Sequence, residues 1–157
     1  TDEFKKLESE YSGYLYFKSI DLSDCENIHK NVFKGYVTNK IQLDGYVNNA
    51  AMAYDDIVTN LNIDKLKAMY NVNVFTPMMI TKYVLRNMLL SKKKGSIIHI
   101  SAMSASLTED QKDRIYKRTS LKTATCVKSV AETVAFLLSD KACSITGQNV
   151  HVDNGTI

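Results

Sequence analysis

Several residue types are scarce in this sequence of 157 residues, and each scarcity disfavours a class of protein. There is no tryptophan, one proline and six glycines, which disfavours a turn-rich β-sandwich and favours long helices joined by short loops. The three cysteines, Cys25, Cys126 and Cys143, form an odd set with no CxxC pair and no histidine at ligand spacing. A disulfide framework and a metal site are therefore disfavoured, and we expect a reducing compartment.

Charge and apolar runs exclude two further classes of partner. The 20 Lys and Arg residues face 17 Asp and Glu residues, and the basic ones are scattered except at Lys92–Lys94, so we expect no nucleic-acid partner. No apolar run reaches the roughly 18 residues of a membrane span, and the acidic start at Thr1–Phe4 is unlike a targeting segment. We therefore expect no membrane partner and a cytoplasmic protein, with the mitochondrial matrix as the alternative.

The spacing of apolar residues divides the chain into alternating strands and helices. Runs rich in apolar and aromatic residues predict strands at 14–20, 43–47, 96–101 and 148–152. Helical spacing predicts helices at 25–40, 64–90, 109–117 and 129–138, the long one bent near Pro77. Strands that alternate with long helices imply a parallel sheet with helices on both faces. The predicted fold class is therefore α/β, in a single domain over 1–157.

Short motifs follow one another along the chain in a recognisable order. They are Asp21-Leu22, Asn48–Ala51, Asn71–Val74, Gly95–Ser101, Val134–Asp140, Ile145–Gln148 and Val152–Gly155. In this order and spacing they resemble the short-chain dehydrogenase/reductase family, of the 3-oxoacyl-ACP reductase type, from about Ser19 to Asn154. The resemblance implies an incomplete, Rossmann-like doubly wound parallel sheet, with NADP(H) as cofactor, an acyl carrier protein thioester as substrate and a homo-oligomeric assembly.

The resemblance also assigns candidate cofactor-binding residues at the carboxyl ends of the strands, where ligands bind in open α/β sheets. Asp21 and Leu22 are expected beside the adenine, and Asn49, Ala50 and Ala51 beside the riboses. The family usually has glycine where this chain has Ala51. Two alternatives need no cofactor, because Asp21–Asp24 can serve as a helix cap and Asn48–Ala51 as a polar strand exit.

Asn73 is the candidate catalytic residue. It lies on the apolar stripe of its predicted helix, where an unpaired amide is costly, so we expect it to have a specific partner. In the family the matching asparagine interrupts the helix and holds a water of the proton relay. The alternative is a polar residue that the helix interior simply tolerates.

The parts of the family pattern that carry phosphate binding and proton transfer are missing. The glycines are never closer than eight residues, so no Gly-rich loop is present to cradle a pyrophosphate. Ala102 stands at the position of the family's catalytic serine, although Ser104 is near. Tyr116 is the only later tyrosine, and Ser120 stands where the lysine of Tyr-x-x-x-Lys belongs. We expect Tyr116, with Lys122 as a displaced partner, not to be catalytic.

Residues 108–139 resemble the family's later substrate loop and the helix after it, which places an internal deletion near 106–108. Three hypotheses follow. The chain belongs to a short-chain reductase related to NADPH-dependent 3-oxoacyl-ACP reduction, impaired or inactive in this form; it is a catalytically silent oligomerisation or binding module of the same fold; or its coding sequence was joined wrongly across the junction.

Overall fold

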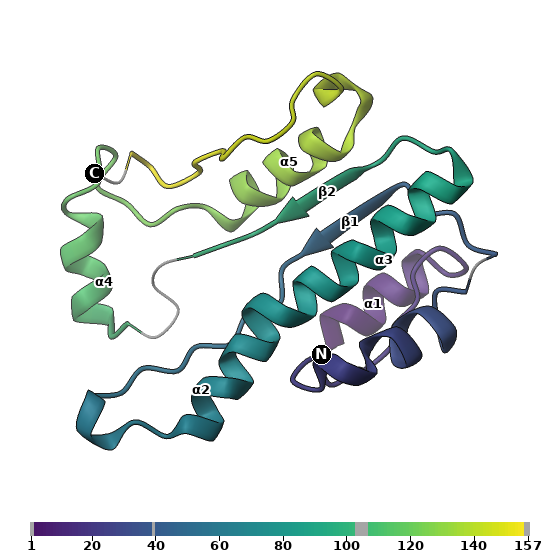
Figure 1. Ribbon diagram of the computed structural model, residues 1–157. Helices are drawn as coiled ribbons and strands as arrows, with labels where there is room; N and C mark the ends of the chain where they lie inside the picture. The colour runs from purple at the N-terminus through teal and green to yellow at the C-terminus, as the bar shows by residue number, and fades with distance from the viewer. Residues whose placement is uncertain (1, 39, 103–106, 156–157) are drawn as a thin grey trace.

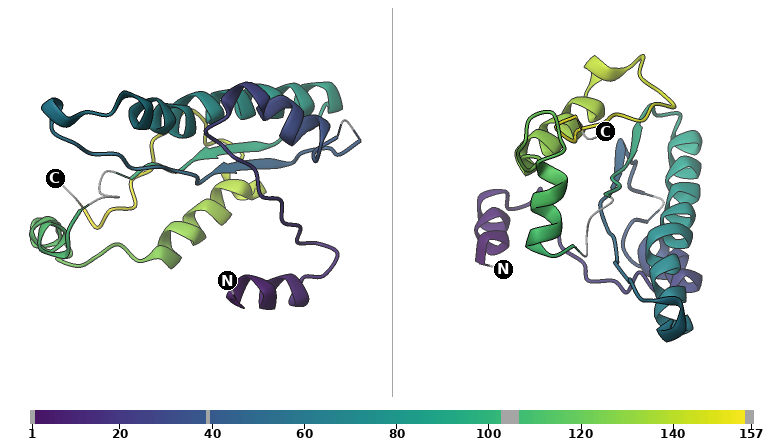
Figure 2. Two further views of the ribbon diagram at one scale, coloured as in Figure 1. Left: turned by 90° about the horizontal axis from the view of Figure 1, so that it is seen from below. Right: turned by 90° about the vertical axis from the view of Figure 1, so that its left-hand side faces the viewer.

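The computed structural model describes residues 2–38, 40–102 and 107–155. It places a small parallel sheet between two helical layers (Figure 1). The helix α3 (Thr76–Ser91) covers one face, and α5 (Val127–Leu138) lies against the other. The helix α2 (Ile63–Tyr70) lies beyond the carboxyl ends of the strands (Figure 1). The view along the sheet in Figure 2 shows this three-layer order. The α/β prediction, with helices on both faces of a parallel sheet, is confirmed.

The sheet has two strands in the described part of the chain, β1 (Gly45–Asn48) and β2 (Ser96–His99). They pair in parallel with Gly45 opposite Ser96 and Asn48 opposite His99. The ladder extends at both ends, because Ser96 N–H donates to the Asp44 carbonyl (3.2 Å) and Ile100 N–H to the Asn48 carbonyl (2.9 Å). Both strands fall within the ranges predicted from their apolar runs, to within one residue.

Two glycines let the helical layers approach the sheet closely. A Cβ on Gly95 would lie 2.6 Å from Met88 Cε of α3, and a Cβ on Gly45 would lie 2.9 Å from Leu138 Cδ2 of α5. The amide of Asn87 in α3 also fixes the entry to β1: it accepts from Leu43 N–H (3.0 Å) and donates to the Ile41 carbonyl (2.9 Å). The strands are thus held from both sides at their amino ends.

The long helix predicted over 64–90 is divided. A π-helical turn, Asn71–Phe75, separates α2 from α3, so the interruption precedes Pro77. Pro77 lies in the first turn of α3, where a proline fits because its missing N–H is least needed. α3 ends at Ser91. The next residue, Lys92, has a left-handed φ of 52°, and its N–H donates to the Leu89 carbonyl (3.2 Å).

The remaining elements are short. α1 (Asp2–Glu10) was not predicted, and the Phe4 and Phe17 rings, 5.3 Å apart, join it to the segment that follows. The helix predicted over 25–40 is a 3₁₀ turn, Cys25–Asn27, and a π-helical segment, His29–Lys34. α4 (Glu109–Tyr116) begins with a capping box between Thr108 and Gln111. Two more 3₁₀ turns are at Val58–Asn60 and Asp140–Ala142.

Two predicted strands are wrong. Residues 15–20 and 148–152 are without regular secondary structure. A strand exists only where a neighbour completes its hydrogen bonds, and no third strand lies beside either segment in the described part of the chain. Their apolar and β-branched composition gives a propensity for strand formation, but the partner strand is missing. Within the described residues, no helix is long and apolar enough to cross a membrane.

The apolar side chains that are buried in the described residues are few: Ile28, Pro77, Val84, Met88 and Ala142. Ile28 comes from the segment that packs on α3, where the His29 and Tyr83 rings stack at 4.3 Å and the Phe33 ring lies 5.2 Å from the Tyr83 ring. The core therefore lies between α3, the sheet and the 25–34 segment.

Substituting Met88→Ala should destabilise the fold by about 2–5 kcal/mol, because it opens a cavity between α3 and the strand entry at Gly95. The adjacent Leu89 is 76% exposed, so Leu89→Ala should change stability by about 0.5 kcal/mol or less. Urea unfolding of both variants measures the difference. Equal midpoints would contradict this placement of the core.

Candidate functional site

The π-helical turn Asn71–Phe75 joins segments that follow two predicted strands. Asn71 Nδ2 donates to the Ser23 carbonyl (2.8 Å), and the buried Thr76 Oγ1 donates to the Leu22 carbonyl (2.7 Å). These bonds hold the loop that contains Asp21 and Leu22 against the start of α3. The turn places its side-chain amides on neighbouring loops instead of on its own helix.

Asn73 has the specific partner that its position predicts. Its Nδ2 donates to the Met52 carbonyl and its Oδ1 accepts from Met52 N–H, both at 2.8 Å. This reciprocal pair fixes the segment Asn49–Ala51, which lies between β1 and Met52. Asn73 itself is exposed to solvent. Its side chain acts as a positioning group for the backbone after β1.

Asp21 forms a tight turn rather than a helix cap. Its Oδ1 accepts from Ser23 N–H (2.8 Å) and from Ser23 Oγ (2.7 Å). These two hydrogen bonds stabilise the carboxylate and hold the pKa of Asp21 below its ordinary value. The capping alternative is wrong in detail, because Asp24 precedes the 3₁₀ turn and makes no side-chain cap bond. Both hydrogen bonds are made by Oδ1 of the carboxylate.

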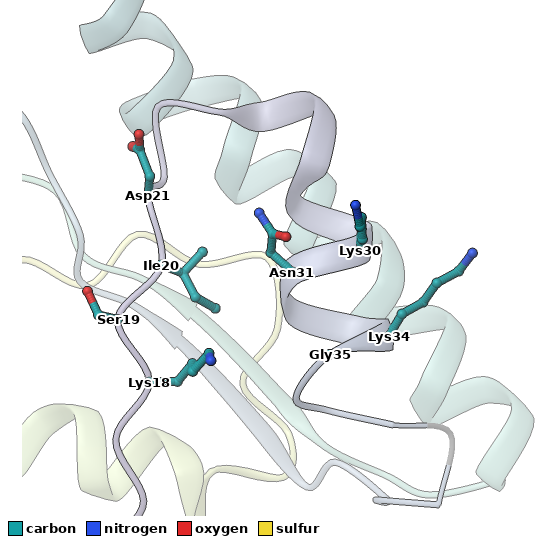
Figure 3. Close-up of a pocket in the computed structure, with 8 residues that line it drawn as sticks. All are labelled: Lys18, Ser19, Ile20, Asp21, Lys30, Asn31, Lys34 and Gly35. Atoms are coloured by element: carbon teal, nitrogen blue, oxygen red, sulfur yellow. The ribbon is translucent and has the colours of Figure 1, made fainter.

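A cavity of about 650 Å³ opens beside Asp21 (Figure 3). It lies between the extended segment 18–21 and the His29–Lys34 helical segment, from which Ile20 and Asn31 point toward one another. Three lysines line it against the single carboxylate of Asp21: Lys18, Lys30 and Lys34. Lys34 extends away from the cavity in this view. The cavity borders Asp21 but not Asn49–Ala51, so the predicted cofactor residues do not share one pocket.

The predicted proton-transfer positions are not brought together. Ser101 and Ala102 follow β2 and are exposed, and Ser104 lies outside the described residues. Tyr116 ends α4. Lys122 Nζ donates to the Lys117 carbonyl at 3.1 Å instead of reaching Tyr116. Lys112, one turn before Tyr116 in α4, interacts electrostatically with Tyr116, but its Nζ donates to Glu109 Oε1 (2.7 Å).

Hydrogen bonds that join residues 120–123 to Asn154 and Gly155 were not predicted from the sequence. Ser120 N–H donates to the Gly155 carbonyl and Leu121 N–H to the Asn154 carbonyl, both at 3.2 Å. Asn154 Nδ2 also donates to the Thr123 carbonyl (2.9 Å). Asn154 and Gly155 have positive φ values of 59° and 72°. Asn and Gly both tolerate positive φ, so the Asn-Gly dipeptide was the sequence signal that could have predicted this turn.

Metal binding finds no support in this part of the molecule. Among residues 2–38, 40–102 and 107–155, no three His, Cys, Asp or Glu side chains are grouped so that they could hold an ion. The three cysteines are free thiols. The site is therefore defined by backbone groups, amides and the Asp21 carboxylate.

Comparison with known proteins decides the family. Residues 2–134 match the family model described as short chain dehydrogenase. The chain belongs to this family. The resemblance drawn from the ordered motifs is confirmed, and the π-helical turn Asn71–Phe75 of this short chain dehydrogenase homologue coincides with one of those motifs.

Relatives with curated names match part of the chain. It is 45% identical over 56 residues to the 3-oxoacyl-[acyl-carrier-protein] reductase FabG of Staphylococcus epidermidis, covering 36% of this chain and 23% of that protein. The FabG of Rickettsia felis is 42% identical over 57 residues, covering 36% and 24%. The matched stretch thus spans about a quarter of the length of these relatives.

Solved structures share the fold. A 4-hydroxyisoleucine dehydrogenase complexed with NADH is similar with a TM-score of 0.78 and 24% identity, covering 90% of this chain and 81% of that one. A mutant of that name complexed with NADH and succinate has a TM-score of 0.83 and 21% identity, covering 99% and 84%. The predicted incomplete Rossmann-like α/β fold is confirmed.

Substituting Asn73→Ala removes both hydrogen bonds to Met52, and each contributes about 0.5–1.5 kcal/mol. The Met52 amide should then exchange its hydrogen faster, measured by NMR. Asn60→Ala is the matched control, because the Asn60 side chain makes no hydrogen bond in the described residues. An unchanged Met52 amide would contradict the positioning role of Asn73.

Proposed function

We propose that this chain is a short-chain reductase homologue, related to NADPH-dependent 3-oxoacyl-ACP reduction, that is impaired or inactive as a reductase. The observation that carries the proposal is the setting of Tyr116. Ser120 stands at the lysine position, Lys122 Nζ donates to the Lys117 carbonyl, and Ala102 stands at the serine position. A ketone reductase of this type needs an acid positioned at the carbonyl oxygen.

The cofactor proposal covers only the nucleoside end of the cofactor. For that end we propose Asp21 and Leu22 at the adenine, and Asn49, Ala50 and Ala51 at the riboses. The described glycines supply no phosphate cradle, since none of them lies in a turn between a strand and a helix N-terminus. The residues present therefore do not fit a complete dinucleotide, and we assign no reaction step to NADP(H).

A second candidate function is a catalytically silent module that assembles with other copies of itself. An exposed apolar stripe supports it, running along one side of the α2–α3 region at Tyr70, Val74, Met78, Leu85 and Leu89. These positions recur at helical spacing. Contiguous exposed apolar surface of this kind marks interaction sites. A homo-oligomer and an acyl carrier protein thioester are the partners we propose for this fold.

The domain organisation belongs to the same proposal. We propose one domain over 1–157, with family segments absent near 106–108, where Ser106 lies outside the described residues and Thr108 caps α4. A coding segment with Tyr-x-x-x-Lys at this junction would support the hypothesis of an active reductase. Its absence would support the hypothesis of a catalytically silent module.

NADPH should bind weakly or not at all, because nothing described cradles its phosphates. Calorimetric titration, with quenching or enhancement of NADPH fluorescence as a second readout, measures the affinity. A FabG reductase serves as the positive control. A dissociation constant in the micromolar range would contradict this expectation.

The chain should not reduce an acetoacetyl thioester above background. A positioned general acid contributes about 10²–10⁴ to the rate, and groups that act as a unit lose nearly all acceleration together. NADPH oxidation followed by absorbance tests this with the wild type and with Tyr116→Phe. Turnover that this substitution abolishes would show that Tyr116 is catalytic after all.

A further inference from the structure

Residues 2–20 form an arm that stands outside the three layers of the fold. The arm consists of α1, a turn at 11–14 and the segment 15–20, which has no regular secondary structure. Figure 2 shows α1 outside the layers formed by the sheet and the helices that cover it. α1 buries none of its residues, and in the rest of the arm Tyr14 is 90% exposed. The arm therefore presents most of its surface to solvent.

The segment 15–20 has an unpaired backbone. Leu15 N–H donates to the Tyr11 carbonyl (3.0 Å) and completes the turn. From residue 16 to residue 20, neither the N–H groups nor the carbonyls are hydrogen-bonded to another described residue. Leu, Tyr, Phe and Ile supply four of the six side chains of the segment, and aromatic and β-branched residues favour strands. The arm thus carries a strand-forming segment without a neighbouring strand.

The same chain contains a strand with a free edge. The Asp44 and Asn48 carbonyls accept hydrogen bonds from β2. Because the hydrogen-bonding direction alternates along a strand, Gly45 and Val47 direct their N–H and C=O groups away from β2. The backbone of these two residues is hydrogen-bonded to no group in the ranges that the structure describes, and both are exposed. Such an edge is a template for one more strand.

The end of the arm is fixed to the π-helical turn and α3 rather than to the sheet. Thr76 Oγ1 donates to the Leu22 carbonyl (2.7 Å), and Asn71 Nδ2 donates to the Ser23 carbonyl (2.8 Å). Figure 3 shows residues 18–21 running as an extended chain up to this anchored point. A second copy can meet the segment where it lies, whereas pairing with its own β1 requires the anchored end to move.

We propose that two copies of this chain exchange arms, so that the segment 15–20 of each pairs with the free edge of β1 in the other. Each copy supplies one strand and one edge, and a two-fold pair therefore satisfies both copies. The contact is a strand addition, in which backbone hydrogen bonds provide the affinity. This inference rests on the second candidate function, assembly with other copies, and assigns it to an interface separate from the α2–α3 stripe.

Side chains of the arm would gain burial in this pairing. Tyr16 and Phe17 are 69% and 68% exposed, and a fully buried aromatic side chain removes about 150–250 Å² from water. Adjacent side chains of a strand point to opposite faces, so one ring would lie on each face of the extended sheet. The paired segments are short, however, and small interfaces are weak. We therefore expect a dimer that dissociates on dilution.

The first test compares the complete chain at several concentrations. Light scattering should show a dimer at high concentration and a monomer after dilution. Hydrogen exchange should show the Gly45 and Val47 amides, and alternate amides of 16–20, protected only in the dimer. A monomer throughout, or a dimer in which these amides exchange as in the monomer, would overturn the proposal. Protection that does not depend on concentration would indicate pairing within one chain and would also overturn it.

A proline pair removes the donors of the arm. Neighbouring N–H groups point to opposite sides of a strand, so one of Lys18 and Ser19 faces the other copy in any register. The double variant Lys18→Pro, Ser19→Pro loses that N–H in both copies. Two lost hydrogen bonds per dimer should weaken dimerisation at least about tenfold. The matched control, Lys18→Ala with Ser19→Ala, keeps both N–H groups and should still dimerise.

The fold of the monomer should survive the proline pair, because neither N–H group is hydrogen-bonded in the described structure. Circular dichroism checks this. If the variant unfolds, a peptide of residues 14–21 added to the wild type replaces it. The peptide should dissociate the dimer while the Gly45 and Val47 amides stay protected, and a scrambled peptide should do neither. A peptide without effect on a wild-type dimer would contradict the exchange.

One more variant separates this inference from the α2–α3 stripe. Leu89→Glu places a charge on the stripe, where Leu89 is 76% exposed, and should leave the exchange of arms intact. A dimer that Leu89→Glu dissociates and the proline pair does not would overturn the exchange and support assembly through the stripe. A dimer that only the proline pair dissociates would support the exchange and contradict the stripe as the interface.

Discussion

The pairing of the Asn73 amide with the Met52 backbone holds the loop that follows the carboxyl end of β1. Asn73 lies in the π-helical turn, whose neighbours Asn71 and Thr76 hold the loop after residue 20. A regular helix would rotate these side chains out of reach, since a π turn adds one residue to the cycle. The irregular turn therefore organises both loops that the family resemblance assigns to a cofactor.

The sheet between the helices is narrow, and this explains both the small core and the open groove. The two described strands present little area to cover. α3 packs closely on them at Gly95 and Met88, and α5 lies against β2 and approaches β1 at Gly45 through Leu138. Toward the N-terminus of α5, a groove of about 420 Å³ lies between the helix and the sheet. Parallel sheets normally have both faces covered. Here one face is covered only in part.

Sequence patterns correctly predicted the helices and strands that have a packing or pairing partner within the described chain. β1, β2 and the helices α2, α3, α4 and α5 carry clear apolar runs or spacing, and all of them are present. Residues 14–20 and 148–152 resemble β1 and β2 in composition. Strand pairing needs two segments, however, and the composition of one segment does not show whether a partner strand lies beside it. The sequence predicted that the Asn73 amide has a hydrogen-bond partner. It could not identify that partner as the Met52 backbone, because the contact depends on tertiary structure.

The parallel pairing of β1 with β2 also has a kinetic consequence. Each register pair joins residues 51 positions apart, as 96 − 45 shows for Ser96 and Gly45, so the ladder closes a long loop before it gains any stability. Loop closure costs only about 0.6 kcal/mol more for each doubling of length, but contacts of long range slow folding. α2 and α3 lie inside this loop and need only local contacts. Early formation of this helical region would shorten the search that brings the two strands together.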